Sequence, residues 1–402
     1  MKLLVYSHDA FGLGNIRRML AICEHLLQAI PSLSILLLSG SPMMQGFRIP
    51  KGLDYIKLPC LNRGTTGKIA TKYLGMDVDE TVKLRAKLIR SAAASFKPDL
   101  VLVDKKPYGI QNELMPTLNY LKGVHPYTKI VLLLRDILDA PDVTIAEWQK
   151  YGFNQTIEEY YDRLLIVGTP EVFDFCKSYQ LPPSIAFKAR YCGYLRRPQG
   201  QKLITEVRQE LELAERDRLV VVTPGGGEDG YPMVDAFLKG AASAQFKSLV
   251  ISGPEMPVQQ RRELYQTAAN LPQVAMREFS DDLMSYLAAA DIIVSMGGYN
   301  TVCEVLSAGK RAVIVPRVKP SQEQILRTTC MSKFDFFSVV EPDQLNPQKL
   351  SQAIQYQMQQ AARQTVQPAI DLNGLSRIAH HLSSLMNEPP RDSVEQRSYA
   401  IR

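Results

Sequence analysis

The sequence predicts an α/β protein built from two doubly wound, Rossmann-like parallel sheets that face each other across a cleft. Its 402 residues favour two to three domains at about 150 residues each. Short runs that are apolar throughout alternate with segments of helical periodicity, which is typical of parallel strands covered by helices on both faces. No segment repeats with a period of about 20–50 residues, which excludes a solenoid. The composition, 46% apolar and 22% charged, is typical of a globular chain.

The first half opens with a compact apolar strand followed by a helix. The strand is predicted at 2–7, and apolar residues then recur at helical spacing from 15 to 29. A second helix is predicted at 76–96. Further buried strands are expected at 34–38, 99–103, 129–134 and 164–167.

A second series of the same kind follows. It begins with a predicted helix at 203–213. Five strands are then expected, at 219–223, 248–252, 274–277, 291–295 and 311–315. Several of these runs stop at glycine or proline, which is where a strand gives way to a loop.

The two series are separated by Arg190–Pro198 (RYCGYLRRP), which has the composition of a linker. We expect a first domain at 1–196 and a second at 197–374. Apolar residues on one face of 375–388 predict a closing helix, and 389–402 has the composition of a flexible tail.

Charge is divided unevenly between the two halves. Residues 1–197 contain 26 Lys and Arg against 18 Asp and Glu, a net +8, whereas residues 198–402 contain 21 against 23, a net −2. The basic half favours an anionic partner, such as a phosphorylated acceptor or a membrane surface, with a plain solvated face as the alternative. No nucleic-acid motif occurs, so nucleic acid is not expected as a partner.

The six cysteines and the N-terminus predict a cytoplasmic protein. No C-x-x-C and no zinc spacing occurs, so the cysteines are expected to be reduced thiols. No secretory signal and no membrane-spanning apolar stretch is found.

Glycine-rich turns follow two strands of the second series. One is Gly225-Gly226-Gly227, and the other is Gly297-Gly298. Such turns let backbone N–H groups approach an anion, and the N-terminus of the following helix adds positive potential. A plain strand–helix turn is the alternative at 225–227.

The helix after Gly298 contains polar residues suited to a nucleotide. Asn300 or Thr301 is predicted to cap it, and Glu304 lies one turn further on, where a carboxylate accepts hydrogen bonds from ribose hydroxyls. Glu323 and Gln324, after the next strand, offer paired donor and acceptor groups for a sugar. Ordinary capping and a polar helix entry are the alternatives.

The run from Val294 to Arg327 (VSMGGYNTVCEVLSAGKRAVIVPRVKPSQEQILR), with the glycine loop and the opening HDAFGLGNIRR, resembles MurG-like glycosyltransferases of family 28. It also closely resembles an uncharacterised branch of predicted glycosyltransferases that has a similar SHD-x-FGLG opening. The resemblance implies the GT-B fold, a nucleotide-sugar donor of the UDP type, and no further cofactor and no metal. Asp77 and Asp79 match a metal motif of another fold, but they begin a helix, where acidic residues favour the dipole.

Carried over position by position, the resemblance implies a complete donor site. The diphosphate would be held at Gly225, Gly226, Gly297, Gly298, Asn300 and Thr301, with Gly227 completing the loop. Glu304 would bind ribose, Glu323 and Gln324 the sugar, and the backbone near Phe279 the base edge.

The N-terminal loop departs from the family pattern. Gly12 and Gly14 carry no side chain that would keep a ligand away from the backbone. Asn15 stands where many relatives have a histidine. An amide cannot act as a general base near neutral pH. Asn15 would instead cap the helix. His8, or Asp9 with a pKa raised by burial, is predicted as the base.

Charges near this loop are predicted to form the acceptor side. Arg18, Asp104 and Arg135 would line it together with Gly12, Gly14 and Asn15, with mutual pairing of the charges as the alternative.

Three functions fit these residues. The first is an inverting, metal-independent hexosyl transfer from a nucleotide sugar to an acceptor hydroxyl in glycan biosynthesis, with an anionic or lipid-linked acceptor and peripheral contact of the basic half with the membrane. The second is a nucleotide-sugar hydrolase or epimerase on the same fold. The third is a nucleotide-sugar-binding protein whose catalytic loop has degenerated.

Overall fold

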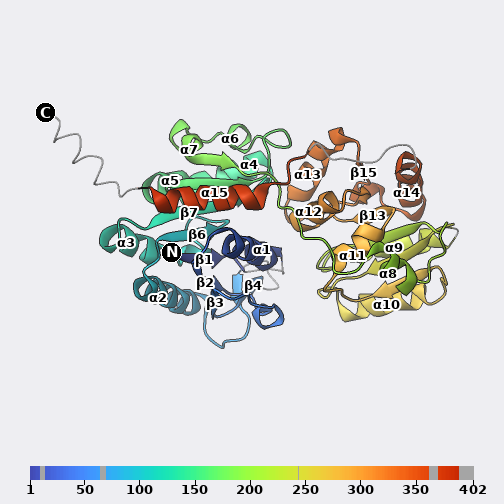
Figure 1. Cartoon of the computed structure of the whole chain (residues 1–402), viewed down its shortest axis with the longest axis horizontal. Coiled ribbons are helices and arrows are strands. Elements are labelled where there is room, and N and C mark those ends of the chain that lie inside the picture. The colour runs from blue at the N-terminus through green and yellow to red at the C-terminus, as the bar shows by residue number, and fades with distance from the viewer. Residues whose placement is uncertain (10–13, 64–68, 243, 362–369, 389–402) are drawn as a thin grey trace.

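The structure is a computed structural model that describes residues 1–9, 14–63, 69–242, 244–361 and 370–388. Two α/β domains lie next to each other along the long axis of the molecule (Figure 1). Each domain is a parallel sheet with helices on both faces, so the predicted pair of doubly wound sheets is confirmed.

The first domain contains a seven-stranded parallel sheet in the order β3-β2-β1-β6-β7-β8-β9. The strands are β1 (Lys2–Ser7), β2 (Ser34–Ser39), β3 (Leu53–Lys57), β6 (Leu100–Asp104), β7 (Lys129–Arg135), β8 (Arg163–Val167) and β9 (Ala189–Tyr191). A separate hairpin is formed by β4 (Leu61–Arg63) and β5 (Ile69–Thr71).

Alternate residues of β1 point into two cores. Leu3 and Val5 pack towards α1, whereas Leu4 and Tyr6 pack towards the helices of the opposite face. Because both faces are covered, the strand is apolar on both sides. The helices are α1 (Gly14–Ala29), α2 (Val78–Phe96), α3 (Met115–Val124), α4 (Pro141–Tyr151), α5 (Phe153–Tyr160), α6 (Phe175–Ser178) and α7 (Pro183–Lys188), with 3-10 turns η1 (Met44–Gly46) and η2 (Ile110–Asn112).

The second domain contains a six-stranded parallel sheet in the order β12-β11-β10-β13-β14-β15. Its strands are β10 (Leu219–Thr223), β11 (Lys247–Ile251), β12 (Val274–Arg277), β13 (Ile292–Ser295), β14 (Arg311–Ile314) and β15 (Phe337–Val339). Its helices are α8 (Ile204–Glu210), α9 (Tyr231–Ala241), α10 (Val258–Ala268), α11 (Leu283–Ala289), α12 (Tyr299–Ala308), α13 (Glu323–Met331) and α14 (Pro347–Ala361), with η3 (Ser332–Phe334) and η4 (Pro342–Gln344). Helices α9, α10 and α14 cover one face of this sheet.

Each sheet reverses its strand order once. The reversal lies between β1 and β6 in the first domain and between β10 and β13 in the second. The chain leaves the carboxyl ends of the two central strands in opposite directions, which opens a ligand-binding position there in doubly wound sheets. We call these positions the first switch point (His8, Asp9, Asp104 and Lys105) and the second switch point (Gly225–Gly227, Gly297 and Gly298).

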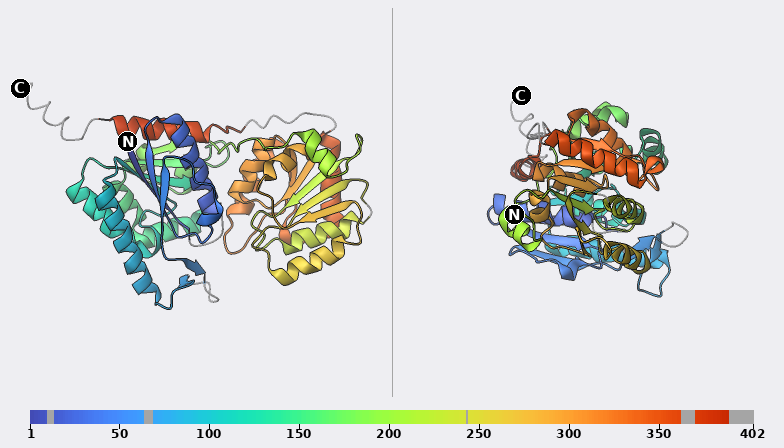
Figure 2. Two further views of the ribbon diagram at one scale, coloured as in Figure 1. Left: turned by 60° about the horizontal axis from the view of Figure 1, so that its bottom comes forward. Right: turned by 90° about the vertical axis from the view of Figure 1, so that its right-hand side faces the viewer.

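The chain passes between the domains twice, in two segments that lie side by side. The Tyr194 N–H donates to the Asp371 carbonyl at 2.8 Å, and the Gly374 N–H donates to the Tyr194 carbonyl at 3.0 Å. Leu195 and Asn373 also form an antiparallel bridge. After the second crossing, α15 (Gly374–Asn387) packs against α1 (Figure 2).

Several sequence-based predictions need correction. The predicted linker, Arg190–Pro198, does contain the first crossing between the domains, but it overlaps β9 at its start, and Tyr194 and Leu195 are fully buried. The helix predicted at 203–213 is shorter, at Ile204–Glu210. The sequence analysis also missed the short strands β3, β4, β5 and β15, because they carry polar residues or are too brief to show a period.

The six cysteines are free thiols. In the part of the chain that the structure describes, no helix is long and apolar enough to cross a membrane.

Candidate functional site

Asp9 lies at the end of β1, buried and only partly hydrogen-bonded. Its N–H donates to the Ser7 carbonyl at 2.9 Å, which turns the chain sharply around His8. The Ser39 hydroxyl donates to Asp9 Oδ2 at 2.6 Å, whereas the buried Oδ1 has no partner among the described residues. Burial raises the pKa of Asp9 to about 6. The carboxylate is therefore ionised at neutral pH but basic enough to accept a proton.

His8 is held as a neutral imidazole. Burial, followed by the positive charges of Lys105 and Lys106, lowers the pKa of His8 well below its usual value. Its Nδ1 is buried without a partner in the described part of the chain. His8 and Asp9 are both buried, at 5% and 3% exposure.

Asn15 and the charges beside it are already engaged. The Asn15 amide donates to the His8 carbonyl at 2.6 Å from inside the first turn of α1, so the prediction that Asn15 caps this helix is wrong. Arg18 forms a buried ion pair with Asp104 at 2.6 Å. Pairing, the alternative considered for these charges, is what the structure shows. Gly12 lies outside the described residues.

Lys105, which the sequence analysis missed, follows Asp104 directly. Its φ is +72°, and the Lys106 N–H donates to the Asp104 carbonyl at 2.9 Å, so Lys105 is the central residue of a γ-turn with positive φ. A residue with a side chain pays about 1–3 kcal/mol for such a conformation. Two consecutive lysines at a strand end were the signal in the sequence that could have drawn attention to it.

Backbone atoms of the glycine loop at the second switch point pack closely against backbone atoms of the turn after β11. Gly225 and Gly227 have positive φ, at +81° and +97°. A Cβ on Gly227 would lie 2.3 Å from the Ser252 carbonyl oxygen, and one on Gly253 would lie 2.3 Å from the Gly226 carbonyl oxygen. Gly227 and Gly253 are therefore needed for packing, because the turns after β10 and β11 are in contact.

Gly297 and Gly298 lead directly into α12, whose first residue is Tyr299. The N-cap is Gly298, with φ −64°, and no side chain caps the helix, so the prediction that Asn300 or Thr301 is the cap is wrong. A Cβ on Gly298 would meet only Gln324 Nε2 at 3.8 Å and Thr301 Oγ1 at 4.0 Å. No packing in the structure therefore requires glycine at this position.

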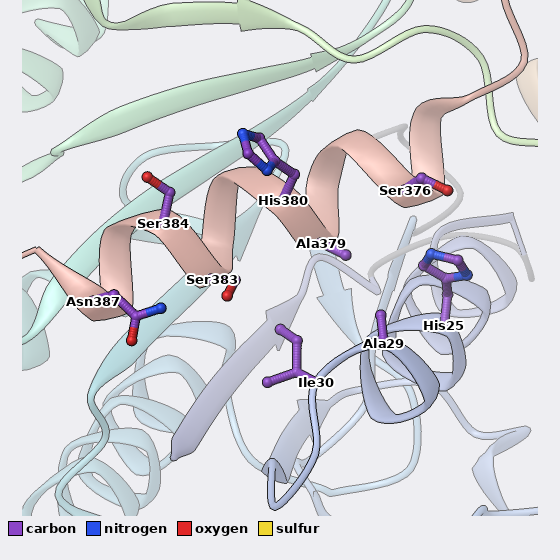
Figure 3. A pocket seen from close by; sticks show the side chains of 9 residues that line it. All are labelled: His25, Ala29, Ile30, Ser376, Ala379, His380, Ser383, Ser384 and Asn387. Atoms are coloured by element: carbon purple, nitrogen blue, oxygen red, sulfur yellow. The ribbon is translucent and has the colours of Figure 1, made fainter.

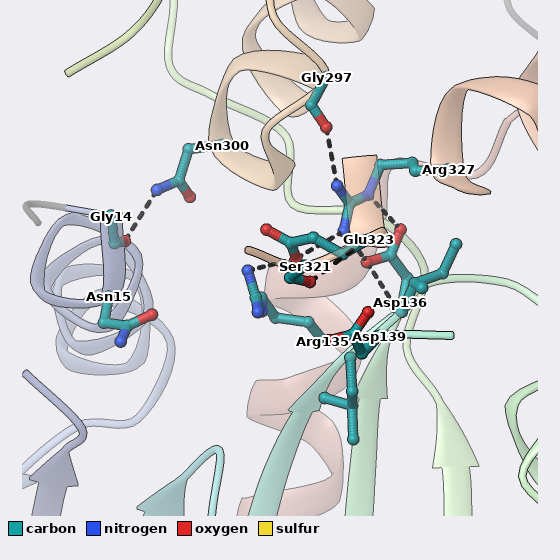
Figure 4. Close-up of polar contacts among 12 residues, drawn as sticks. Gly14, Asn15, Arg135, Asp136, Asp139, Gly297, Asn300, Ser321, Glu323 and Arg327 are labelled. Carbon is teal, nitrogen blue, oxygen red and sulfur yellow. Dashed lines mark hydrogen bonds and ion pairs between the residues drawn. The ribbon is translucent and has the colours of Figure 1, made fainter. Parts of the chain in front are cut away.

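Asn300 joins the two domains instead of capping. Its amide donates to the Gly14 carbonyl at 2.8 Å (Figure 4). Its carbonyl oxygen accepts from Arg197 at 2.8 Å. Thr301 is buried, with its hydroxyl beside Gly225 and Gly298. The start of α12 thus faces the start of α1.

Glu304, the predicted ribose residue, also reaches across the domain boundary. Its side chain is 3% exposed and pairs with Arg17 of α1 at 2.9 Å, while Arg17 itself is 41% exposed. Arg17 was not singled out from the sequence, because a charge on an exposed helix face carries no pattern.

The start of α13 faces the end of β7. Glu323 pairs with Arg135 at 2.7 Å, and Arg327 forms a bidentate pair with the buried Asp136 at 2.7 and 2.8 Å (Figure 4). Burial alone would raise the pKa of Glu323, but Arg135 and Arg327 outweigh burial and lower it to about 2. Gln324 accepts from the Arg317 N–H at 3.0 Å. These groups are held rigidly.

The remaining predicted features lie apart from these contacts. Phe279 follows β12 and is 59% exposed. Asp77 caps α2 by accepting from the Glu80 N–H at 2.7 Å, which confirms its assignment to a helix start. No group of three or more metal-ligating side chains was found within the described ranges.

A groove of about 620 Å³ lies between the second half of α1 and α15 (Figure 3). It is lined by His25 and His380 together with small and polar residues. None of the predicted site residues lines it, so it is separate from the two switch points.

The two switch points together offer complementary chemistry. The second presents helix-start and glycine backbone to an anion. The first presents a carboxylate that can accept a proton, beside charged donors. Polar contacts between α1 and α12 and between β7 and α13 hold these two edges against each other.

The glycosyltransferase family 28 C-terminal domain matches residues 202–382. A UDP-N-acetylglucosamine--N-acetylmuramyl-(pentapeptide) pyrophosphoryl-undecaprenol N-acetylglucosamine transferase of Haemophilus influenzae is 25% identical over 155 residues, which are 38% of this chain and 44% of that protein. The chain thus matches less than half the length of this relative.

Solved structures extend the likeness of the fold to nearly the whole chain. Acinetobacter baumannii MurG has a TM-score of 0.61 at 12% identity, covering 95% of this chain and 99% of that one. A UDP-GlcNAc 2-epimerase from Neisseria meningitidis bound to UDP-GlcNAc has a TM-score of 0.60 at 13% identity, covering 96% and 100%. The chain therefore has the GT-B fold, and its residues 202–382 match the C-terminal domain of glycosyltransferase family 28.

Proposed function

We propose that the protein transfers a hexose from a nucleotide diphosphate sugar, most simply a UDP-sugar, to an acceptor hydroxyl with inversion and without a metal. One observation supports this most strongly. The start of α12, within the segment that matches family 28, lies at the second switch point with Glu304 buried one turn further on. Backbone N–H groups and the helix dipole there suit a diphosphate, and the carboxylate suits ribose.

Asp9 is the base in this proposal. It removes the proton of the acceptor hydroxyl, whose oxygen attacks the anomeric carbon as the nucleoside diphosphate leaves against the amides near Gly298. His8 is the alternative base. Glu323 and Gln324 hold the sugar, with Arg135 and Arg327 fixing the Glu323 carboxylate. No cofactor besides the sugar donor takes part.

Glu304→Ala tests the donor site. Loss of a hydrogen-bonded carboxylate is expected to weaken UDP binding about 10- to 100-fold, which thermal shift and calorimetric titration would measure across a panel of nucleotides and nucleotide sugars. Arg17→Gln is the matched control, because it removes the ion-pair partner and leaves the carboxylate. UDP binding that survives Glu304→Ala, or that Arg17→Gln weakens equally, would count against the ribose role.

A nucleotide-sugar epimerase or hydrolase is the second candidate. It is supported by the likeness of the fold to the UDP-GlcNAc 2-epimerase and by Asn15 at the place of the family histidine. Incubation of the bound donor without acceptor separates these reactions. Free sugar indicates hydrolysis, an altered sugar indicates epimerisation, and an unchanged donor favours transfer. Binding without turnover over many acceptors would favour a purely binding protein.

The acceptor is proposed to be anionic or lipid-linked, as the name of the Haemophilus relative suggests for that enzyme. Exposed Met43, Tyr73 and Leu74, with Lys72 beside Tyr73, support peripheral contact of the basic first domain with a cytoplasmic membrane face. Cosedimentation with anionic vesicles tests this contact, and a protein that stays in solution would contradict it.

A further inference from the structure

The cations around the first switch point are almost all paired. Four of them have carboxylate partners: Arg18 with Asp104, Arg85 with Glu113, Lys106 with Glu147, and Arg135 with Glu323. The side chain of Lys105 has no hydrogen bond or ion pair with the residues that the structure describes, whereas its backbone N–H donates to the Leu133 carbonyl at 2.9 Å. Lys105 as a residue is half-buried and therefore partly withdrawn from water. A charge that is partly withdrawn from water destabilises the folded protein unless an opposite charge pairs with it.

Further unused donors lie on the neighbouring elements. The Nε groups of Arg18 and Arg135 are buried without a partner in the described part of the chain. Arg18 is on α1, Arg135 ends β7, and Lys105 follows β6. Charged N–H donors from three neighbouring elements thus remain free at one edge of the sheet, and such donors bind oxyanions strongly.

The backbone at Lys105 is held in a conformation that disfavours a side chain. Its φ of +72° suits glycine, yet lysine occupies the position. Burial, followed by the Arg135 guanidinium, lowers the pKa of Lys105 to about 8, while Glu323 and Asp104 act in the opposite direction. The ammonium group is thus mostly charged at neutral pH and lies within electrostatic reach of the Glu323 carboxylate.

We propose that Lys105 binds an acidic group, a carboxylate or a phosphate, on a substrate that lies at the first switch point beside Glu323. The inference rests on the proposed function, because Glu323 is there the residue that holds the donor sugar. The acidic group has two sources: a uronic acid as the transferred sugar, or an acidic group on the acceptor. Either one supplies the missing partner of Lys105.

The test compares Lys105→Gln with Lys106→Gln. The second is a matched control, since Lys106 is the adjacent lysine and its partner, Glu147, lies at the surface. Lys105→Arg keeps the charge. Lys105→Gly removes the charge and relieves the positive φ, so it should be at least as stable as the parent, and a loss of binding in it cannot be attributed to unfolding.

Two calorimetric titrations identify the source of the acidic group. If the donor sugar carries it, UDP-glucuronic acid binds about tenfold or more tightly than UDP-glucose, and Lys105→Gln abolishes this preference whereas Lys106→Gln keeps it. If the acceptor carries it, inorganic phosphate binds the UDP-glucose complex, and Lys105→Gln weakens that binding about tenfold. Lys105→Arg retains either effect.

The outcome that overturns the inference differs from the one that overturns the proposed function. If UDP binds but neither the uronic acid preference nor phosphate binding depends on Lys105, the inference is wrong and the donor site stands. If UDP fails to bind at all, the proposed function fails, while phosphate binding to the free protein still reports on Lys105.

Discussion

The first switch point is built from ionisable side chains, whereas the second is built from glycine backbone. Both lie where a parallel sheet reverses its strand order, so topology alone would offer the same opening in each domain. At the first, Asp9 has an unpartnered oxygen and Lys105 an unpaired ammonium group within the described chain. At the second, the start of α12 has no side-chain cap. Under the proposed function, the first switch point would transfer a proton and the second would bind an anion, and the difference lies in the residues that follow the strands.

Asp9→Asn should have the largest effect, because it removes the proposed proton acceptor. Turnover is expected to fall about 10²- to 10⁴-fold. The parent enzyme should gain activity as pH rises through about 6, the pKa of Asp9, and this rise should disappear in the variant. Loss of turnover in His8→Asn but not in Asp9→Asn would move the base to His8.

Stability gives an independent readout of the same carboxyl. The folded pKa of about 6 lies above the ordinary value of 3.8, so folding is favoured when Asp9 is protonated. The parent should therefore lose stability relative to Asp9→Asn as pH rises from about 4 to about 6, by on the order of 3 kcal/mol at most. Denaturant titrations at both pH values measure this difference.

Gly227→Ala should have the next largest effect, on folding and not on binding alone. The new Cβ would lie 2.3 Å from the Ser252 carbonyl oxygen at a residue with φ of +97°. We expect a loss of about 3 kcal/mol in the free energy of unfolding, measured by thermal and denaturant unfolding. A variant as stable as the parent would show that the contact between the two glycine turns is not needed.

Gly298→Ala should have the smallest effect on folding and a clear effect on nucleotide affinity. Its φ of −64° suits alanine, and the added methyl would stand between Gln324 and Thr301 in ordinary contact. Stability should stay within about 0.5 kcal/mol, whereas UDP affinity should fall about tenfold because the methyl obstructs the proposed diphosphate position. Gly123→Ala, with open space around it, is the control. Undiminished UDP affinity would exclude the start of α12 as the diphosphate site.

The glycine-rich turns and buried strands could be predicted from the sequence because they depend on local composition. Strands β6 and β13 are buried throughout and apolar except for their last residue, and Gly297-Gly298 follows β13 closely. The partners of the charges could not be predicted in this way. Glu304 pairs with Arg17, and Arg327 with Asp136, across separations of 287 and 191 residues, which only the packing of the two domains determines. The backbone strain at Lys105 likewise depends on the sheet around it.

The paired crossings between the domains have a mechanical consequence. Twisting one domain against the other would shear the hydrogen bonds between Tyr194 and the segment from Asp371 to Gly374, whereas bending both segments together would preserve them. We therefore expect any movement of the edges that carry α1 and α12 to bend the two segments together instead of twisting them. A single backbone cut near Arg196 would leave the domains tethered by the other segment.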